Sequence, residues 1–420
     1  MMTQAFHTGI SGIQSTSGAI DITSNNLANI STPGFRGYTT EFASLFENMI
    51  NTPVGHSNSV GVGSRAQASS MITTQGSLAL SDRNTDIAIM GRGWFGVQGQ
   101  GEPLFTRNGA FTFDENSDLV TTEGYHVLGT MGNNISTDNE LTQRLDEISL
   151  EDIGVQEKLR FPKTLTFPAE PSTEAKFMAN LGTGAEGFEV ITIGASVIDP
   201  QNNKNNLRLE FTKSEPQNPP GSQWDVIATT QSLDGETIYD TQTGRVEFSP
   251  EGALTLSTLT TIDNNGMPVA IDLGEGFDGI VSVDTPVVTG SSVADGMIGG
   301  DLEGYSISAD GEVLATFTNG QQSSVGKIAL YQFANEQGLE RVSGTNFKQS
   351  SNSGEALFFK DDQGNNITGA TLSNFRLESS NVDLSVGLTE LIILQRSFDA
   401  NSKSITTADQ MMQKALNMDA

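Results

Sequence analysis

Apolar side chains spaced three and four residues apart at both ends of the chain constrain its fold more than any other feature. Residues with this spacing lie on one helical face and form the seam of a coiled-coil-like pair. The N-terminal set is Phe6, Ile10, Ile13, Ile20 and Leu27, interrupted by Ser17 and Ser24. The C-terminal set is Leu384, Leu388, Leu391, Phe398, Ile405, Met412 and Leu416, interrupted by Gln395, Ser402 and Asp409. We predict an amphipathic helix at each end and an assembly interface made of these apolar residues.

Local signals limit the two predicted helices. The N-terminal helix cannot pass Thr32-Pro33-Gly34, because proline disfavours the helical conformation of the residue before it. At the other end, the side chains of Asn381 and Asp383 are suited to cap a helix start. Asp409 is the one charge on either seam, and an unpaired carboxylate is costly to bury. We expect Asp409 to lie at a wet edge or to meet a partner.

Charge is distributed unevenly along the chain. There are 51 acidic and 22 basic residues, which gives a net charge of -29. Residues 151–300 hold 22 of the acidic and 8 of the basic side chains, whereas residues 1–35 hold one charged side chain, Asp21. Identical helices repel one another less when they carry little net charge. The distribution favours self-assembly through the ends, and the negative total opposes binding to nucleic acid or to anionic membranes.

The residues between the ends have the pattern of β-structure. Mixed or alternating apolar stretches bounded by Gly, Asn and Asp turn signals occur at 86–90, 207–211, 224–227 and 327–331. Polar, proline-containing segments at 168–172 and 216–221 predict a domain junction and a surface loop. We predict a mainly β, multi-domain protein with β-rich outer domains. A pair of long N- and C-terminal α-helices forms its coiled-coil-like inner domain.

The predicted domain limits follow from these patterns. Residues 1–30 and 380–420 form a terminal helical assembly domain, and residues 31–70 form an extended or hairpin connection. Residues 71–150 together with 301–379 form an inner β domain, and residues 151–300 form an outer acidic β domain.

Motifs that could carry chemistry are weak. Residues 91–96 have the G-x-G-x-x-G spacing, but the residues that follow cannot open the helix that a dinucleotide phosphate requires. Residues 114–125 begin like a calcium loop, yet the required glycine is Leu119 and the required glutamate is Tyr125. Turn glycines and a polar hairpin turn are the favoured interpretations.

Other candidate groups are equally unspecific. His7, His56 and His126 are far apart in sequence, and the acidic pairs Glu151-Asp152 and Asp361-Asp362 are typical of solvated turns. Cysteine is absent, which excludes disulfides and thiolate chemistry. We predict no catalytic, cofactor or metal site, and we predict that the chain is not an enzyme.

The N-terminal residues and the apolar clusters bear on export and membrane insertion. The first basic residue is Arg36, so the start lacks the positive region of a secretory signal. The strongest apolar cluster, 391–394, is far shorter than the ~20 residues of a membrane-spanning helix. We expect no membrane insertion, and any export to use a route without a cleaved signal peptide.

Four stretches resemble the flagellar rod and hook protein family. The N-terminal stretch comprises Ser11-Gly12-Ile13, residues 25–29 and Thr32-Pro33-Gly34-Phe35. The next stretches are residues 75–78 with 86–95, where Trp94 replaces the usual phenylalanine, and residues 105–111 with Asp114, 119–120 and 124–125. The last comprises residues 377–384, 395–401 and 407–409. Rod proteins are much shorter, so within this family the acidic insert favours a hook subunit.

The resemblance implies a tube of stacked subunits in the extracellular part of the bacterial flagellum, with no cofactor. Terminal helices would line the inside of the tube and β domains would point outward, giving a flexible joint that transmits motor torque. Implied partners are further copies of the chain, the distal rod protein, the hook cap protein, the hook-filament junction protein and the flagellar export apparatus.

Two alternatives remain open at this point. Within the family, the chain could be a distal rod or hook-filament junction protein. From another class, it could be a secreted β-rich protein that modifies carbohydrate or adheres to a surface. Tube formation by the purified chain separates the two classes, because such a secreted protein has no reason to form tubes.

Overall fold

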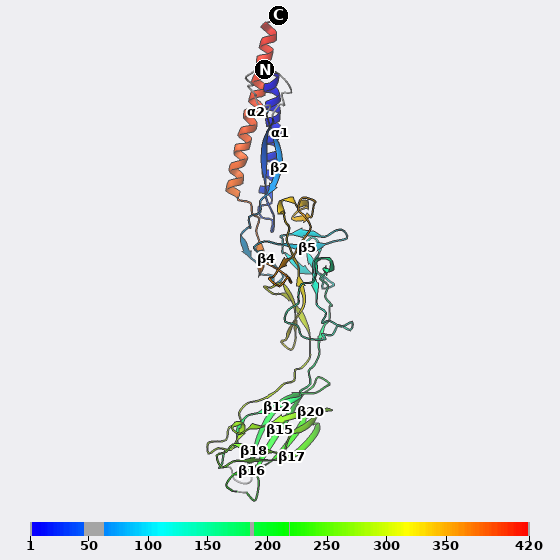
Figure 1. Cartoon of the computed structure of the whole chain (residues 1–420), viewed down its shortest axis with the longest axis vertical. Helices are drawn as coiled ribbons and strands as arrows, with labels where there is room; N and C mark the ends of the chain where they lie inside the picture. Colours follow the sequence, from blue (N-terminus) through cyan, green and yellow to red (C-terminus); the bar gives the residue numbers. More distant parts are fainter. Residues whose placement is uncertain (1, 46–62, 185–188, 218, 419–420) are drawn as a thin grey trace.

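The computed structural model describes residues 2–45, 63–184, 189–217 and 219–418. The molecule is elongated, and three units follow one another along its length (Figure 1). A helical unit lies at one end, an inner β domain lies in the middle and an outer β domain lies at the far end. The predicted fold class, mainly β with a helix at each end of the chain, is confirmed.

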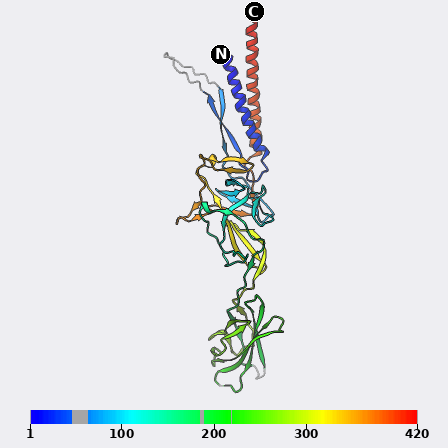
Figure 2. The same cartoon turned by 90° about the vertical axis from the view of Figure 1, so that its right-hand side faces the viewer.

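The two helices run antiparallel. Helix α1 spans Met2–Ala28 and helix α2 spans Leu384–Met418, so both chain ends lie at the same tip (Figure 2). The Asp383 carboxylate accepts the backbone N–H of Ser385 at 2.8 Å and of Val386 at 2.9 Å. These bonds satisfy two of the donors that a helix start leaves free, so Asp383 is the predicted cap.

A long β-hairpin lies beside α1. Strands β1 (Tyr38–Leu45) and β2 (Gly63–Met71) pair antiparallel, with Tyr38 opposite Met71 and Leu45 opposite Gly63. The chain reaches this hairpin through Gly34, whose φ of +69° is one that glycine adopts without strain. A Cβ at that position would stand 2.4 Å from the backbone nitrogen of Asn108, so the turn is also tightly packed.

The inner β domain is built on a 13-stranded sheet that combines both halves of the chain. Its main path runs β11 (Thr166–Phe167), β24 (Gly300–Ile307), β25 (Glu312–Phe317), β26 (Gln322–Ile328), β9 (His126–Met131), β5 (Trp94–Gln98), β6 (Leu104–Thr106), β29 (Asn346–Lys348) and β28 (Glu340–Ser343). Strands off this path are β7 (Phe111–Phe113), β8 (Leu119–Thr121), β10 (Glu157–Lys158) and β27 (Leu330–Tyr331).

Small elements complete this domain. Two-stranded sheets pair β3 (Leu78–Leu80) with β33 (Arg376–Glu378), β4 (Ile87–Met90) with β32 (Thr371–Asn374), and β30 (Phe359–Lys360) with β31 (Asn366–Ile367). Two 3-10 helices span Ile153–Val155 and Glu336–Gly338. The core includes Ile87, Phe95, Phe111 and Phe317, which are all inaccessible to solvent. Because the two halves share this core, the outer domain is an insertion into the inner one.

The outer domain consists of sheets packed around a separate core. The largest sheet is an antiparallel meander of β14 (Val190–Ile198), β15 (Lys204–Lys213), β16 (Ser222–Ser232), β17 (Ile238–Phe248) and β18 (Leu254–Ser257). Two smaller sheets contain β19 (Thr261–Asn264), β20 (Met267–Asp272), β12 (Glu174–Phe177) and β23 (Ser292–Ala294), and β13 (Ala179–Asn180), β22 (Asp278–Val281) and β21 (Gly274–Glu275). Alternate residues Leu207, Leu209 and Phe211 of β15 point into the core beside Trp224.

The structure corrects the limits of the outer domain. Leu159, Phe161, Leu165 and Phe167 belong to the inner core, so the predicted boundary at residue 151 lies too early. The two domains join through a neck where Glu170 pairs with Met297, each backbone N–H donating to the other's carbonyl at 2.8 Å. The polar segment 168–172, interpreted from the sequence as a junction, lies at this neck. We therefore define the outer domain as residues 170–297.

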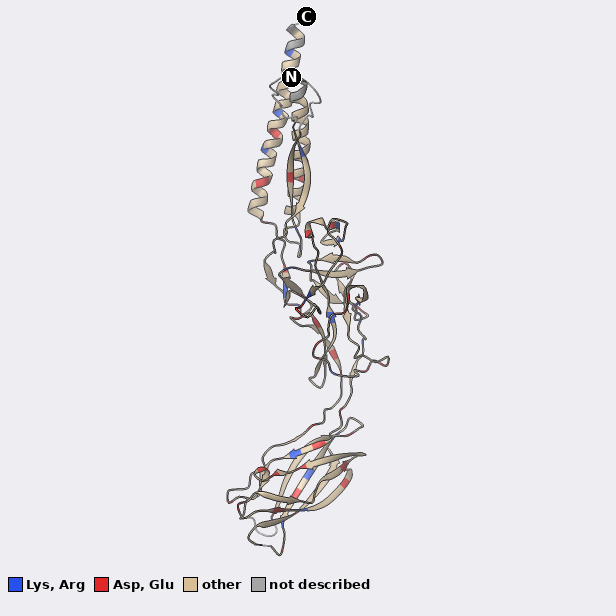
Figure 3. Ribbon diagram, viewed as in Figure 1, with Lys and Arg blue, Asp and Glu red and all other residues tan. Residues whose placement is uncertain are grey.

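Charged side chains are sparse on α1, whereas α2 and the β domains carry charges of both signs (Figure 3). In the outer sheet, Arg208 pairs with Glu210 at 3.0 Å and Arg245 pairs with Asp225 at 3.1 Å. These pairs are partly exposed and contribute little stability. In the described part of the chain, no helix is both long and apolar enough to cross a membrane.

Candidate assembly interface on the terminal helices

Small residues bring α1 and α2 into close contact. A Cβ on Gly9 would stand 2.6 Å from Cγ1 of Ile405, and a Cβ on Gly12 would stand 2.7 Å from the side-chain nitrogen Nδ2 of Asn401. At the other end of the pair, a Cβ on Gly387 would stand 2.9 Å from Cδ2 of Leu27. Glycine at these positions lets the helix axes approach more closely than any other residue would allow.

The buried face of α1 lies one residue away from the predicted seam. Buried positions that follow the same three- and four-residue spacing are Gly9, Gly12, Thr16, Ala19, Thr23 and Asn26, and Ser15 is also buried. Of the predicted residues, Phe6, Ile13, Ile20 and Leu27 are half-buried, and Ile10 is 45% exposed. The sequence pattern pointed to the large apolar residues. The face in contact with α2 instead carries the small residues beside them, because small side chains let the two helices pack closely.

Half of the predicted α2 seam faces α1. Leu391, Ile405 and Met412 are half-buried, whereas Phe398 is 36% exposed at the margin. The predicted seam was interrupted at Gln395 and Asp409. The residues just before them, Leu394 and Ala408, are the ones that are buried. Asp409 is exposed and accepts a hydrogen bond from Gln413 at 3.0 Å, so it lies at the expected wet edge. The side chain of Leu416 lies outside the described side chains.

The hairpin covers a second side of α1. The hydroxyl of Ser15 lies 3.0 Å from that of Ser64 in β2. Asn26 pairs with the backbone of Tyr38 in both directions, accepting its N–H at 3.0 Å and donating to its carbonyl at 2.7 Å. Ser15 and Asn26, two buried polar residues of α1, therefore have partners within the chain, as buried polar groups require.

The first three turns of α2 carry apolar side chains that nothing in the described chain covers. Leu384, Val386, Leu388, Ile392 and Ile393 are each between 45% and 64% exposed. Glu390 is the one charged residue between positions 384 and 395. Such an exposed apolar patch on a helix is typical of an interaction surface. We name these five residues the α2 patch.

A buried ion cluster fixes the helical unit to the inner domain. Arg36 lies 2.9 Å from one carboxylate oxygen of Glu378, and Arg107 lies 3.4 Å from the other. The first oxygen also accepts the N–H of Gly76 at 3.0 Å, and Arg107 donates to the carbonyl of Gly91 at 2.7 Å. Burial lowers the pKa of Arg107 to about 10, although attraction to Glu378 opposes this shift.

Neighbouring residues extend this junction. Asn381 accepts the N–H of Gly37 at 2.8 Å and donates to the carbonyls of Ile72 at 2.8 Å and Thr74 at 2.9 Å. The Arg341 guanidinium lies 4.5 Å from the ring centre of Phe35. Sequence reasoning missed the ion cluster. The available signal was Arg36, the first basic residue of the chain, directly after the Thr32-Pro33-Gly34 break.

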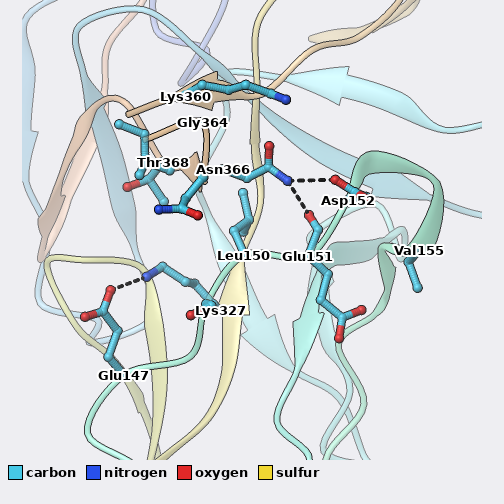
Figure 4. Close-up of a pocket in the computed structure, with 13 residues that line it drawn as sticks. Glu147, Leu150, Glu151, Asp152, Val155, Lys327, Lys360, Gly364, Asn366 and Thr368 are labelled. Atoms are coloured by element: carbon cyan, nitrogen blue, oxygen red, sulfur yellow. Dashed lines mark hydrogen bonds and ion pairs between the residues drawn. The ribbon is translucent and has the colours of Figure 1, made fainter. Parts of the chain in front are cut away.

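The inner domain also contains an open hollow of about 780 Å³ (Figure 4). Lys327 at its edge pairs with Glu147 at 3.0 Å and with buried Glu312 at 2.9 Å. Asn366 donates to the Asp152 carboxylate at 3.1 Å and to the Glu151 carbonyl at 3.3 Å. These groups bind one another across the hollow, so the arrangement is that of a structural contact between loops.

The other sequence motifs have structural roles. The glycines at 91–96 precede and enter strand β5, as expected for turn glycines. The Asp114 carboxylate accepts the N–H of Asn116 at 2.7 Å and of Asp118 at 2.9 Å within the β7–β8 turn, as predicted. Asp361 caps a similar turn by accepting from Gln363 and Asn365. Among the described residues, no group of acidic or histidine side chains is arranged to hold a metal.

The two histidines that the structure describes lie in different units. His7 is exposed on α1, and His126 lies 3.6 Å from the Asp118 carboxylate in the inner domain. His56 lies outside the described residues.

Three family models match separate parts of the chain. Residues 6–36 match the flagella basal body rod protein, residues 88–157 match the flagellar hook protein FlgE/F/G D1 domain, and residues 374–418 match the flagellar basal body rod FlgEFG protein C-terminal region. The first and last of these contain most of α1 and α2 together with the junction residues Arg36 and Glu378.

Full-length relatives and a solved structure agree with these matches. The flagellar hook protein FlgE of Escherichia coli (strain K12) is 29% identical over 440 residues, covering 99% of this chain and 100% of the relative. That of Borreliella burgdorferi is also 29% identical, over 459 residues, with the same coverage. The crystal structure of Helicobacter pylori flagellar hook protein FlgE2 matches with a TM-score of 0.50 at 15% identity. It covers 72% of this chain and 100% of that one, and it supports the fold.

Proposed function

Because the chain belongs to the flagellar rod and hook protein family, we propose that it is a structural subunit of the bacterial flagellar hook. The observation that carries this proposal is the full-length correspondence to hook proteins, which includes the inserted outer domain as well as both ends. A rod protein of the same family would lack most of the insert.

The uncovered surface of the helical unit supports assembly into a tube. The α2 patch has no cover in the described chain, and burial of one such side chain contributes about 1.5–3 kcal/mol. Copies of the same chain are the simplest partners that bring enough apolar surface. The predicted interface residues that stay partly exposed, such as Ile10, Leu384, Leu388 and Phe398, would then be buried between copies.

The remaining partners follow from the position of a hook subunit. We propose that the tube joins the distal rod protein at one end and the hook-filament junction protein at the other. The hook cap protein would promote addition of subunits, and the flagellar export apparatus would deliver them without a cleaved signal peptide. The polar, charged outer domains would let neighbouring copies slide while the tube bends and transmits torque.

Polymerisation of the purified full chain tests the proposal. We expect tubes in electron micrographs and a sedimenting fraction that grows with protein concentration. The double variant Leu388→Ser/Ile392→Ser should raise the concentration needed for polymer, because two buried contacts between copies are lost. The matched control Leu233→Ser/Ile238→Ser makes the same chemical change at exposed positions of the outer domain.

Clear outcomes would contradict the proposal. A wild-type chain that stays monodisperse at high concentration would argue against a tubular subunit. Equal polymerisation of the two double variants would show that the α2 patch is not part of the interface between copies, without contradicting the tube itself.

A further inference from the structure

Helix α1 has one side that, among the described residues, neither α2 nor strands β1 and β2 cover. Its exposed residues keep the three- and four-residue spacing of a helix seam. They are His7, Ile10, Gln14, Ser17, Asp21, Ser24 and Ala28. Asp21 is the one charged side chain on this helix. We name these residues the α1 stripe.

Helix α2 has an uncovered stripe with the same spacing. Its exposed residues are Val386, Thr389, Ile393, Arg396, Ala400, Lys403, Thr407, Met411 and Lys414. Successive helix residues are about 100° apart, so this α2 stripe lies roughly opposite the buried Leu394 and Ala408 that face α1. The charges on the stripe itself are basic, and Asp399 lies beside it, three residues from Arg396 and four from Lys403, whereas Asp409 lies on another side of the helix.

The charges of the two stripes are complementary and unpaired. In the described residues, the side chains of Asp21, Arg396, Lys403 and Lys414 form no ion pair or hydrogen bond. Asp21 is the one charged side chain on α1, so it has a large influence when α1 meets another helix. A carboxylate on one stripe and a row of cations on the other match a contact between helices of different copies.

Polarity makes the two stripes compatible in a tube. All copies in a tube point the same way, so α1 of one copy meets α2 of another in the antiparallel direction already seen within one chain. We propose that the α1 stripe packs against the α2 stripe of a second copy, and that Asp21 pairs there with Arg396 or Lys403 and sets the axial register. This inference rests on the proposed tubular function.

The contacts within one chain give the scale of that register. Gly9 meets Ile405 and Leu27 meets Gly387, so the numbers of facing residues add to 414 and Asp21 is level with Ile393. At about 1.5 Å per residue, Arg396 lies about 5 Å and Lys403 about 15 Å further along α2. Lys414 lies about 32 Å away, a shift that would leave most of both stripes without a partner.

Charge reversal tests the pairing in the full chain. Asp21→Lys would place a cation against the basic α2 stripe, and we expect the concentration needed for polymer to rise roughly tenfold or more. The second change Arg396→Glu or Lys403→Glu should restore polymerisation to within about threefold of wild type. Lys414→Glu in the Asp21→Lys background is the matched control, because it makes the same change of net charge outside the proposed contact.

Sedimentation and electron microscopy measure the result, and circular dichroism checks that each monomer is folded. Recovery with Arg396→Glu or Lys403→Glu, but not with Lys414→Glu, supports the register. Normal polymerisation of Asp21→Lys, equal recovery with all three partners, or recovery with none would overturn it. Failure of the wild-type chain to form tubes would instead overturn the proposed function, so the two failures are distinguishable.

Discussion

The guanidinium of Arg36 lies 2.9 Å from the carboxylate of Glu378, and both side chains are 2% exposed. Arg107 approaches the same carboxylate from the other side, so one buried acid neutralises part of the charge of two buried bases. These three residues come from the end of the N-terminal segment, the inner domain and the strand before α2. The cluster thus ties the helical unit to the β domains at a single point.

Removing the Glu378 charge should destabilise the inner domain strongly. Glu378→Gln leaves two buried guanidinium groups without a counter-charge, and we expect a loss of roughly 3–5 kcal/mol in the free energy of unfolding. Glu340→Gln is the control, because its pair with Lys348 is exposed and contributes less than about 1 kcal/mol. Urea unfolding followed by Trp94 fluorescence in a Trp224→Phe background isolates the signal of the inner β domain. Equal stability of the two variants would contradict the role of the cluster.

Two glycines of α1 should respond in opposite directions to alanine. Gly9→Ala forces a methyl group against Ile405, whereas a Cβ at Gly18 meets nothing within 4 Å. Alanine favours a helix over glycine by roughly 0.5–1 kcal/mol, so Gly18→Ala should slow amide exchange in α1 about two- to fivefold. We expect Gly9→Ala to accelerate exchange in both helices. Slower exchange in both variants would show that the helices are not closely packed.

The outer domain should lose stability in acid through Asp199. This carboxylate is inaccessible to solvent and accepts hydrogen bonds from the side chains of Asn265 at 2.7 Å and Asn203 at 3.1 Å. Burial opposes its ionisation, but the hydrogen bonds outweigh that effect and lower the pKa of Asp199. The stabilisation is therefore complete above the unfolded-state pKa of about 3.9 and is lost as pH falls through the lower folded-state pKa.

Acid unfolding followed by Trp224 fluorescence measures this dependence. Asp199→Asn should destabilise the outer domain at neutral pH and flatten its stability profile below about pH 4. Asp278→Asn, at an exposed turn of the same domain, is the control and should keep the wild-type profile. A wild-type profile in Asp199→Asn would show that the carboxylate contributes nothing to acid sensitivity.

Deletion of the outer domain should succeed only at the neck. Removing residues 171–296 and joining Glu170 to Met297 by a two-residue glycine link uses the existing strand pair and keeps the inner core complete. We expect this variant to fold and to form tubes with altered bending. Removing residues 151–300 also deletes Leu159, Phe161, Leu165 and Phe167 from the inner core, so it should not fold. Circular dichroism measures folding and electron microscopy shows tubes. A folded 151–300 deletion, or an unfolded 171–296 deletion, would contradict the boundary at the neck.

Sequence alone predicted the elements whose signal is local. The three- and four-residue spacing indicated both terminal helices, Asp383 indicated where α2 begins, and Thr32-Pro33-Gly34 indicated where α1 cannot continue. Alternating apolar residues indicated strands such as β4, β15 and β16. Each of these features depends on residues within a few positions of one another, so the pattern is visible without knowledge of the partners.

Tertiary structure decided the features that join distant residues. The spacing of α1 fits two faces one residue apart, and only the close approach of α2 selected Gly9 and Gly12 over Ile10 and Ile13. The alternating apolar residues at 159–167 do not show by themselves which of the two cores they join. The structure places them in the inner core, so the domain boundary lies at Glu170 and not at residue 151. Arg36 and Glu378 lie at opposite ends of the sequence, and their pairing leaves no periodic trace. Burial removes both charges from water, and the free-energy cost of that desolvation is offset only when the two charges lie side by side in the folded chain.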